Sequence, residues 1–395
     1  MRTKNINDNS LTSRLKWIGG GFLLVIVIIV AFVDFQVKKT HKDCPEIQKK
    51  IETITVIAAN ETNKRNDQSA MIKLNDGRLV IAYSHFGKSS RDIGKSSIYY
   101  QTSSDNGSTW SKEKELIETI ALGSYVPSFY KKPDGTILVL FFVRESERPN
   151  ISSLRQIVFS ADLSTQLTKE RTIVPAPGYF PIASDRLFFD TKSNLLLMPY
   201  PVLVSGEGYS QASVYITKII VSSNFGDTWT DSGITINGFF NDKGFGGAGE
   251  AGFFKNGEKI TLYSRNMIEQ VGACNLTWNG KNYEKGKEYK LNIATWNAQS
   301  TIKYCDDLKG WIATYIRLNK MAASPRSQID VAFSTDAITW KKVFTIADIE
   351  KDGGFMVNEP NIFIENNTVY ISYSVSTKPG NYFDLRITKL PFAAF

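Results

Sequence analysis

The chain has 395 residues, of which 42% are hydrophobic and 22% are charged, so it can bury a core and is not a disordered chain. Its net charge of +8 is typical of nucleic-acid binding, but residues 1–50 hold nine Lys or Arg against four Asp or Glu and contribute +5 of it. Residues 51–395 carry only +3 and no basic stripe suited to phosphates, so we expect no nucleic-acid partner.

An uncharged apolar segment near the N-terminus, WIGGGFLLVIVIIVAFV, runs from Trp17 to Val33. A helix of this length covers ~25 Å, the short end of what crosses a bilayer. A buried core helix would show polar interruptions, and a signal peptide would be followed by small residues, whereas DFQV follows here. The segments we predict are a short basic tail at 1–16, a transmembrane helix at 17–34 and a stalk at 35–50.

The basic residues on the two sides of this segment are nearly balanced, so the positive-inside rule gives little guidance on orientation. The simplest topology is a single-pass membrane protein whose C-terminal domain is extracytoplasmic. In that compartment Cys274 and Cys305 could form one disulfide. The chain has two His and no His/Cys cluster, so we expect no metal site, and without a nucleotide-binding loop we expect no cofactor.

A strand–turn–strand unit occurs six times between residue 51 and the C-terminus. Each copy has apolar residues, a turn built from Asp, Asn or Gly, and then an alternating apolar strand. The turn residues, 58, 59, 63, 53 and 57 positions apart, are Gly77, Gly135, Asn194, Gly257, Gly310 and Asn367. This regular spacing favours radial repetition over a two-layer sandwich. We therefore predict an all-β fold, a six-bladed β-propeller over 51–395, in which the strand from Leu385 to Phe392 completes a blade shared by both chain ends.

A second, shorter repeat of the form S-x-D-x-G-x-T-W overlays the hairpins. It is complete from Ser103 to Trp110, has Asn for Asp in 222–229, is one residue shorter in 334–340 and is decayed at 160–162. We expect the Asp or Asn oxygen to cap backbone N–H groups, the Gly to take a positive φ, and the Trp to pack between blades. These turns should stabilise the fold and take no part in catalysis.

The short repeats resemble the Asp-box (BNR) repeats of the sialidase, or neuraminidase, superfamily, and the resemblance covers nearly all of residues 51–395. It implies a site at the mouth of the central channel, where three arginines surround a sugar carboxylate. Arginine suits this task because it binds a carboxylate bidentately. The resemblance also implies an Asp as general acid/base and a Tyr nucleophile that is activated by a Glu.

The segment from Glu250 to Arg265, two residues that are 15 apart and bracket one hairpin, strongly resembles the Glu-to-Arg segment of sialidases. The resemblance implies that Glu250 is the activating base and Arg265 a carboxylate ligand, and the alternative is an ordinary salt bridge across the hairpin. Arg326, eight residues before Ser334, resembles the third arginine, with an exposed surface residue as the alternative. Asp92 resembles the acid/base Asp, which needs a raised pKa to act as an acid at neutral pH.

Three further residues, His85, Asp185 and Arg186, resemble elements of distant sialidase-like proteins and are candidates for substrate binding. A structural His and a charged strand end are the alternatives. The chain departs from the family at the first arginine, because counting back ten residues from Gly77 gives an Asp. Arg65, two residues earlier, is the candidate to replace that arginine.

A second departure falls where the nucleophilic Tyr is expected, because the chain has Asn358 or Glu359 there. A carboxylate nucleophile would be repelled by the substrate carboxylate, so we expect Glu359 to direct a water, giving inversion or a different sugar. The predicted function is a membrane-anchored, sialidase-like exo-glycoside hydrolase acting on terminal, acidic sugars of glycans. The alternative is a non-catalytic carbohydrate- or protein-binding propeller, which keeps the arginines but needs neither acid nor nucleophile.

Overall fold

Residues 51–395 form one compact unit built almost entirely of strands, which confirms the predicted all-β class. The predicted tail, membrane helix and stalk lie outside the part that is described, and within that part no helix is long and apolar enough to span a bilayer. The computed structural model describes residues 51–91, 94–147, 150–178, 183–206, 213–266, 268–318, 324–379 and 382–395.

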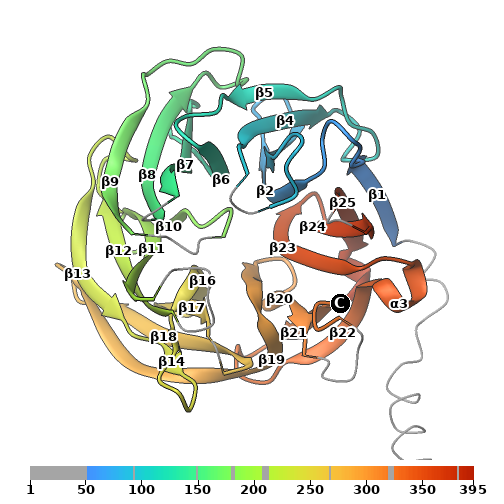
Figure 1. Ribbon diagram of the computed structural model, residues 1–395. Coiled ribbons are helices and arrows are strands. Elements are labelled where there is room, and N and C mark those ends of the chain that lie inside the picture. Colours follow the sequence, from blue (N-terminus) through green and yellow to red (C-terminus); the bar gives the residue numbers. More distant parts are fainter. Residues whose placement is uncertain are drawn as a thin grey trace, which may run out of the picture. The chain divides into compact units, whose positions relative to one another are not determined.

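The strands pair into sheets that are arranged around a common centre, in the manner of a β-propeller (Figure 1). Three of the sheets have four strands each. The first sheet contains β2 (Asn66–Lys73), β3 (Leu79–His85), β4 (Ser97–Ser103) and β5 (Lys114–Ile117). The second contains β6 (Gly123–Lys131), β7 (Ile137–Glu147), β8 (Asn150–Phe159) and β9 (Arg171–Gly178).

The third four-stranded sheet joins the two ends of the compact unit. Its strands, in order of pairing, are β1 (Glu52–Ile57), β25 (Tyr382–Pro391), β24 (Thr368–Lys378) and β23 (Met356–Glu365). The C-terminal segment therefore completes a sheet shared by both ends, as predicted. A four-residue helix, α3 (Ile349–Asp352), precedes β23, and a short 3-10 helix, η1 (Phe392–Ala394), follows β25.

Two larger sheets complete the arrangement. The six-stranded sheet contains β10 (Phe188–Asp190), β11 (Leu195–Ser205), β12 (Val214–Ser222), β13 (Thr230–Ile236), β14 (Phe239–Phe240) and β15 (Gly246–Gly247). The seven-stranded sheet contains β16 (Gly249–Asn256), β17 (Lys259–Arg265), β18 (Gln270–Trp278), β19 (Tyr283–Cys305), β20 (Gly310–Arg317), β21 (Gln328–Ser334) and β22 (Lys341–Asp348). Strand β19 is 23 residues long, and it pairs with β18 through its first half and with β20 through its second half.

All six predicted hairpins form as antiparallel strand pairs. Glycine at the tip supplies the positive φ that the turn needs, as at Gly77 with φ 90° and Gly135 with φ 86°. The fifth hairpin differs from the prediction, because Lys309 takes the positive φ of 49° and Gly310 already belongs to β20. Glycine is needed there for packing, since a Cβ would lie 2.3 Å from the Phe333 ring.

The hydrophobic core is divided among the spaces between neighbouring sheets. One cluster joins Val80 of the first sheet to Val139 and Phe141 of the second. Another joins Ile81 of the first sheet to Tyr370 of the sheet that closes the ring. Because successive side chains on a strand point to opposite faces, Val80 and Ile81 pack in different spaces, and each sheet is held by both neighbours.

The short repeats form the capping hydrogen bonds that the sequence predicts. The Asp105 carboxylate accepts from the Thr109 N–H at 2.8 Å, and Asn224 Oδ1 accepts at the same distance from the N–H four residues on. Equivalent bonds to turn N–H groups occur at Asp336 and Asp162. Hydrogen bonds from the side chain and backbone of Thr109 hold the pKa of Asp105 well below its usual range. These carboxylates are engaged within their own turns, as expected for structural groups.

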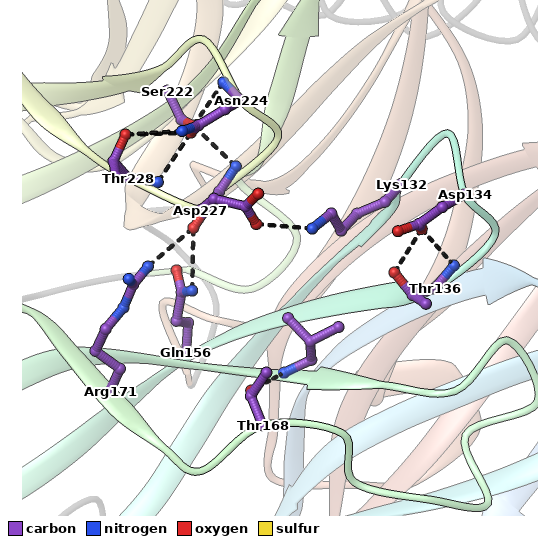
Figure 2. A network of polar contacts seen from close by, with 12 residues as sticks. Lys132, Asp134, Thr136, Gln156, Thr168, Arg171, Ser222, Asn224, Asp227 and Thr228 are labelled. Carbon is purple, nitrogen blue, oxygen red and sulfur yellow. Dashed lines mark hydrogen bonds and ion pairs between the residues drawn. The ribbon is translucent and has the colours of Figure 1, made fainter.

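The second of these turns is also clamped by the neighbouring four-stranded sheet (Figure 2). Gln156 of β8 donates to the Gly226 carbonyl at 3.0 Å and accepts from Trp229 Nε1 at 2.8 Å. Arg171 of β9 donates to the same carbonyl at 3.0 Å. The turn therefore stabilises contact between sheets as well as its own loop.

Candidate functional site

The strand register separates the predicted site from the short repeats. At one end of the β2–β3 hairpin Asn66 pairs with His85, and at the other end Lys73 pairs with Leu79, beside the first S-x-D turn. The start of β16 and the end of β17 correspond to the His85 end, since Gly249 pairs with Arg265 there. We call this end the mouth face, defined by the first residues of β2, β16 and β23.

Residues with a positive φ lie close to the mouth face, at a bulge of β2, β6, β16 and β23 and in the segment just before β10. These residues have φ between 44° and 59°, and they are Gln68, Val126, Asp185, Glu250 and Glu359. A non-glycine residue in this conformation costs about 1–3 kcal/mol, and a bulge re-aims the side chain. Two of the predicted catalytic residues, Glu250 and Glu359, therefore occupy strained positions of the kind that functional sites retain.

Glu250 and Arg265 form an ion pair across the β16–β17 hairpin. Glu250 is 7% exposed, and its Oε1 lies 2.5 Å from Arg265 Nη1. Its Oε2 is buried and has no hydrogen-bond partner among the described residues. Arg265 Nε donates to Asn297 Oδ1 at 2.7 Å, and the arginine side chain is 25% exposed. The predicted pair is thus brought together at the mouth face in a fixed orientation.

Arg326 joins the same group through Asn297 and Asn358. Its Nη2 donates to the Asn297 carbonyl at 3.4 Å, and its Nη1 donates to Asn358 Oδ1 at 2.5 Å. Asn297 therefore contacts both Arg326 and Arg265, one through its backbone and the other through its side chain. Asn358 stands where the Tyr nucleophile was expected, and here it is buried and orients an arginine.

Glu359 follows in β23 as a half-buried residue whose Oε2 is buried and has no hydrogen-bond partner in the described ranges. Burial raises the pKa of Glu359 well above its ordinary value, and the negative charges of Glu250 and Asp67 raise it further. The charges of Arg326 and Arg65 oppose this rise in pKa. Such influences require short separations, so these charged groups gather around Glu359.

Arg65 is held by a carboxylate that the sequence analysis did not assign to the site. Its Nη2 and Nε donate to Asp67 Oδ2 at 2.7 and 3.0 Å. Its guanidinium lies 4.9 Å from the ring centroid of Phe86 and 5.1 Å from that of Phe383. Arg65 is 6% exposed, its guanidinium is paired with Asp67, and its charge acts on Glu359. Its predicted contact with substrate remains a prediction.

Asp185 and Arg186 contact a layer of residues that lies further from the mouth face than the ion pair between Glu250 and Arg265. Asp185 forms an ion pair with Lys303 at 2.5 Å. Arg186 is 3% exposed and donates to the Tyr263 hydroxyl at 2.5 Å and to a carbonyl of β19 at 2.9 Å. Because Tyr263 precedes Arg265 by two residues in β17, this layer lies ~7 Å further along the strand. Their predicted role in substrate binding remains a prediction.

His85 and Asp92 belong to the connection between β3 and β4. Asp92 lies outside the described residues, so its role as general acid stays a prediction. The His85 ring stacks on Tyr99 with the ring centroids 4.3 Å apart, and burial lowers the pKa of His85. His85 lines a cavity in front of this connection, together with Phe86 and Arg144.

The two cysteines of the compact unit do not form the disulfide that the sequence allowed. Cys274 and Cys305 are both buried with free thiols, and they pack in different core clusters. Burial raises the pKa of the Cys274 thiol to about 11. In the described part of the chain no group of three or more His, Cys, Asp or Glu side chains is placed to hold a metal.

Sequence reasoning missed the residues that orient the arginines and the layer below them, namely Asp67, Asn297, Tyr263 and Lys303. One usable signal was present. In three of the repeats the positive-φ residue stands nine positions before the hairpin residue, at Gln68, Val126 and Asp185. In β16 and β23 the interval is seven and eight, at Glu250 and Glu359. Four of these five residues are polar, so a polar residue seven to nine positions before the hairpin residue was the available signal for the bulge.

No known family profile matches the sequence, and no curated protein matches it. Solved structures do match. A protein of unknown function from Dyadobacter fermentans aligns with TM-score 0.66 and 14% identity over 86% of this chain and 99% of that chain. Trypanosoma rangeli sialidase in complex with sialic acid aligns with TM-score 0.64 and 12% identity, over 86% and 59%. NanB sialidase from Streptococcus pneumoniae aligns with TM-score 0.63 and 11% identity, over 86% and 70%.

These identities are low, and the chain spans only 59% of the length of the trypanosomal sialidase. The likeness therefore concerns the fold, and it agrees with the ring of sheets around a common centre (Figure 1). Residues 51–395 have a sialidase-like β-propeller fold.

Proposed function

We propose that this chain is a sialidase-like exo-glycoside hydrolase that removes a terminal acidic sugar from glycans. The observation that carries the proposal is the gathering of Glu359, Glu250, Arg265 and Arg326 at the mouth face. A structural neighbour that binds sialic acid supports an acidic sugar as the substrate class.

Recognition of the sugar carboxylate falls to Arg265 and Arg326. A guanidinium forms two parallel hydrogen bonds to a carboxylate, which fixes both position and orientation. Asn297 holds the two arginines at a common point, and Asn358 fixes the second of them. Holding the arginines in place before binding reduces the entropy lost when the sugar is bound.

Cleavage uses the two carboxyl groups in different protonation states. In this proposal Glu359 takes the role of general acid that the sequence analysis gave to Asp92, instead of directing a water. Its raised pKa keeps it protonated at higher pH than an ordinary Glu, so it can donate a proton to the leaving oxygen. Glu250, whose Oε1 is engaged by Arg265, accepts the proton of a water through Oε2. The water oxygen bonds to the anomeric carbon as the glycosidic C–O bond breaks. This scheme of two carboxyl groups needs no Tyr nucleophile and inverts the configuration.

The test is turnover of a panel of fluorogenic glycosides, sialosides included, by the purified full-length chain. We expect release from acidic sugars, and loss of that release in Glu250→Gln and in Glu359→Gln. Glu258→Gln is the matched control, because Glu258 is an exposed residue at the opposite end of the same hairpin. Release from no glycoside overturns the hydrolase, and release from neutral sugars alone overturns the acidic substrate.

We further propose that residues 17–34 anchor the chain in a membrane with residues 51–395 outside the cytoplasm. The support is the uncharged apolar run from Trp17 to Val33. Protease added to intact cells should then cleave the propeller domain, and the chain should remain in the membrane fraction after a high-salt wash. Release by salt alone would contradict the anchor.

We also propose that the seven-stranded sheet is two blades that share β19, which gives the ring six blades. The support is the way β19 pairs with β18 by its first half and with β20 by its second half. An experimental structure with a continuous flat sheet through β19 would contradict this count.

A further inference from the structure

A cavity of about 750 Å³ lies beside Arg65 at the mouth face. Most of its described wall consists of residues 85–89, 91 and 94–97, from the end of β3 to the start of β4. Thr119 and Leu122, from the connection between β5 and β6, and Arg144 of β7 complete the wall. The volume is in the range of sites that bind small molecules.

The lining of this cavity is basic. It contains Lys88, Arg91, Lys95 and Arg144, and no Asp or Glu among its described lining residues. The connection from His85 to Ser97 has one acidic residue in sequence, Asp92, so positive charge predominates even if that carboxylate is counted.

Three of these cations, Lys88, Arg91 and Lys95, form no ion pair with any residue in the described ranges. Arg144 is 3% exposed at the base of the cavity, where it donates to the Gly94 carbonyl at 3.3 Å. Serine and threonine hydroxyls on the same wall add hydrogen-bond donors. A concave surface with this charge and these donors attracts and holds an anionic group.

The cavity and the carboxyl cluster share a wall. Phe86 lines the cavity, and its ring also lies over the Arg65 guanidinium. Arg65 Nη1 donates to the Ser90 carbonyl, in the connection that forms the cavity wall, at 3.4 Å. Arg65 in turn acts on Glu359. A glycan whose terminal sugar lies at Glu359 therefore has its next unit close to the cavity.

We propose that this cavity binds a second anionic group, carried by the unit next to the terminal sugar. The substrate is then a multiply anionic glycan with a sulfate, phosphate or carboxylate on its penultimate part. This inference rests on the proposed hydrolase function, whose site supplies the first anion contact.

Paired substrates test the proposal in the full-length chain. We expect kcat/KM for sialyllactose that carries a 6-sulfate on its galactose to exceed that for sialyllactose by about tenfold, which is the effect of one charge-assisted hydrogen bond. The difference should lie mainly in KM. The triple variant Lys88→Ala, Arg91→Ala, Lys95→Ala should lose this preference, and its three exposed positions leave the core intact. Lys112→Ala with Lys114→Ala, exposed in the same sheet region, should keep it.

A disialyl glycan, in which a carboxylate replaces the sulfate, separates the possible anions. Preference for the sulfated or the disialyl substrate supports the cavity, and preference for neither overturns it. Equal preference in the triple variant and the wild type also overturns it.

A binding measurement separates failure of the cavity from failure of the hydrolase. Lactose with a 6-sulfate on its galactose, which has no sialic acid, is titrated into the wild type and into the triple variant by isothermal calorimetry. Binding to the wild type with at least about tenfold weaker binding to the variant supports the cavity even if no glycoside is hydrolysed. Hydrolysis of sialosides without such binding leaves the hydrolase and overturns the cavity.

Discussion

The carboxylates at the two ends of the sheets are engaged differently. At the turn end, the oxygens of Asp105 and Asn224 accept hydrogen bonds within their own turns, and Gln156 uses both amide atoms. At the mouth face, one carboxylate oxygen each of Glu250 and Glu359 is buried without a hydrogen-bond partner among the described residues. An unsatisfied buried polar group costs about 1–3 kcal/mol. The turn end is not free of such atoms, since Trp110 Nε1 and Trp340 Nε1 also have no partner among the described residues, but its carboxylates are engaged, whereas those of Glu250 and Glu359 keep one oxygen unpaired.

Backbone conformation differs in part between the two ends. At the turn end the positive φ of a hairpin falls on glycine at Gly77 and Gly135, which adopt it without strain, and on Asn or on Lys309 in other hairpins. At the mouth face it falls on Glu250 and Glu359, for which it is strained. We propose that the strained carboxylates of the mouth face belong to the reaction site, and the following substitutions test that comparison from the largest expected effect to the smallest.

Replacing Arg265 at the mouth face should have the largest effect. Arg265→Met removes a carboxylate ligand and leaves Glu250 without its ion partner. We expect kcat/KM for an acidic glycoside to fall by about 100-fold or more, as for loss of one preorganised donor. Arg78→Met is the control, because its ion pair with Asp76 is exposed at the turn end. Equal losses in the two variants would remove the distinction between the two ends.

Glu359→Gln should separate activity from stability. A carboxyl whose pKa is raised in the folded state contributes stability that is present below its ordinary pKa and is lost as the pH rises through the folded pKa. As the pH rises above the ordinary pKa of a glutamic acid, the Tm of the wild type should therefore fall relative to that of the variant. Glycosidase activity should be absent in the variant at every pH. A parallel pH dependence of the two melting temperatures would contradict the raised pKa.

Gln156→Ala should do the reverse and lower stability alone. It removes the bond to the Gly226 carbonyl, which belongs to the network in Figure 2, and the bond from Trp229 Nε1. We expect the free energy of unfolding to fall by about 1–3 kcal/mol, measured by urea denaturation, with kcat/KM unchanged. Gln166→Ala, at an exposed position after β8, is the matched control and should change neither quantity. A loss of activity in Gln156→Ala without loss of stability would contradict this prediction, because the turn end would then contribute directly to activity.

The smallest effect is expected at the Lys132–Asp227 ion pair, whose charged atoms lie 2.8 Å apart between two sheets at the turn end (Figure 2). Asp227 is 63% exposed, so solvent and salt screen the pair. Lys132→Ala should change the free energy of unfolding by less than about 1 kcal/mol, and less still at high salt. A double-mutant cycle with Asp227→Ala measures the pair alone, and a larger, salt-independent coupling would contradict this view of the turn end.

The features that could be predicted from the sequence are local ones. The six hairpins and the strand from Leu385 to Phe392 follow from alternating apolar residues and from turn residues, both visible within about a dozen positions. The S-x-D turns were predictable for the same reason. The sequence analysis placed Gly310 at the turn itself. Glycine is required there because a Cβ would collide with the ring of Phe333, a contact outside the hairpin that the local sequence does not reveal.

The site was only partly predictable because it depends on bulges and on contacts between distant strands. Glu250 and Arg265 share a hairpin, so their pairing could be anticipated. Asn297 meets both arginines only because β19 lies between two strand pairs, which no local pattern reveals. Asp67 stands where the first arginine was expected, and its role was not anticipated: it lies next to a bulge at Gln68 and binds Arg65, the candidate to replace that arginine.

The pairing of β1 with β25 has a mechanical consequence. A tensile load applied to the chain from its N-terminal side reaches β1 first, and β1 is the outermost strand of its sheet. The ladder that must resist the load includes the Glu52–Lys389 ion pair at 2.9 Å and the Thr53–Thr388 hydroxyl contact at 2.8 Å. Because the last strand of the chain is the partner, a pull that peels β1 away begins to open the ring at its seam.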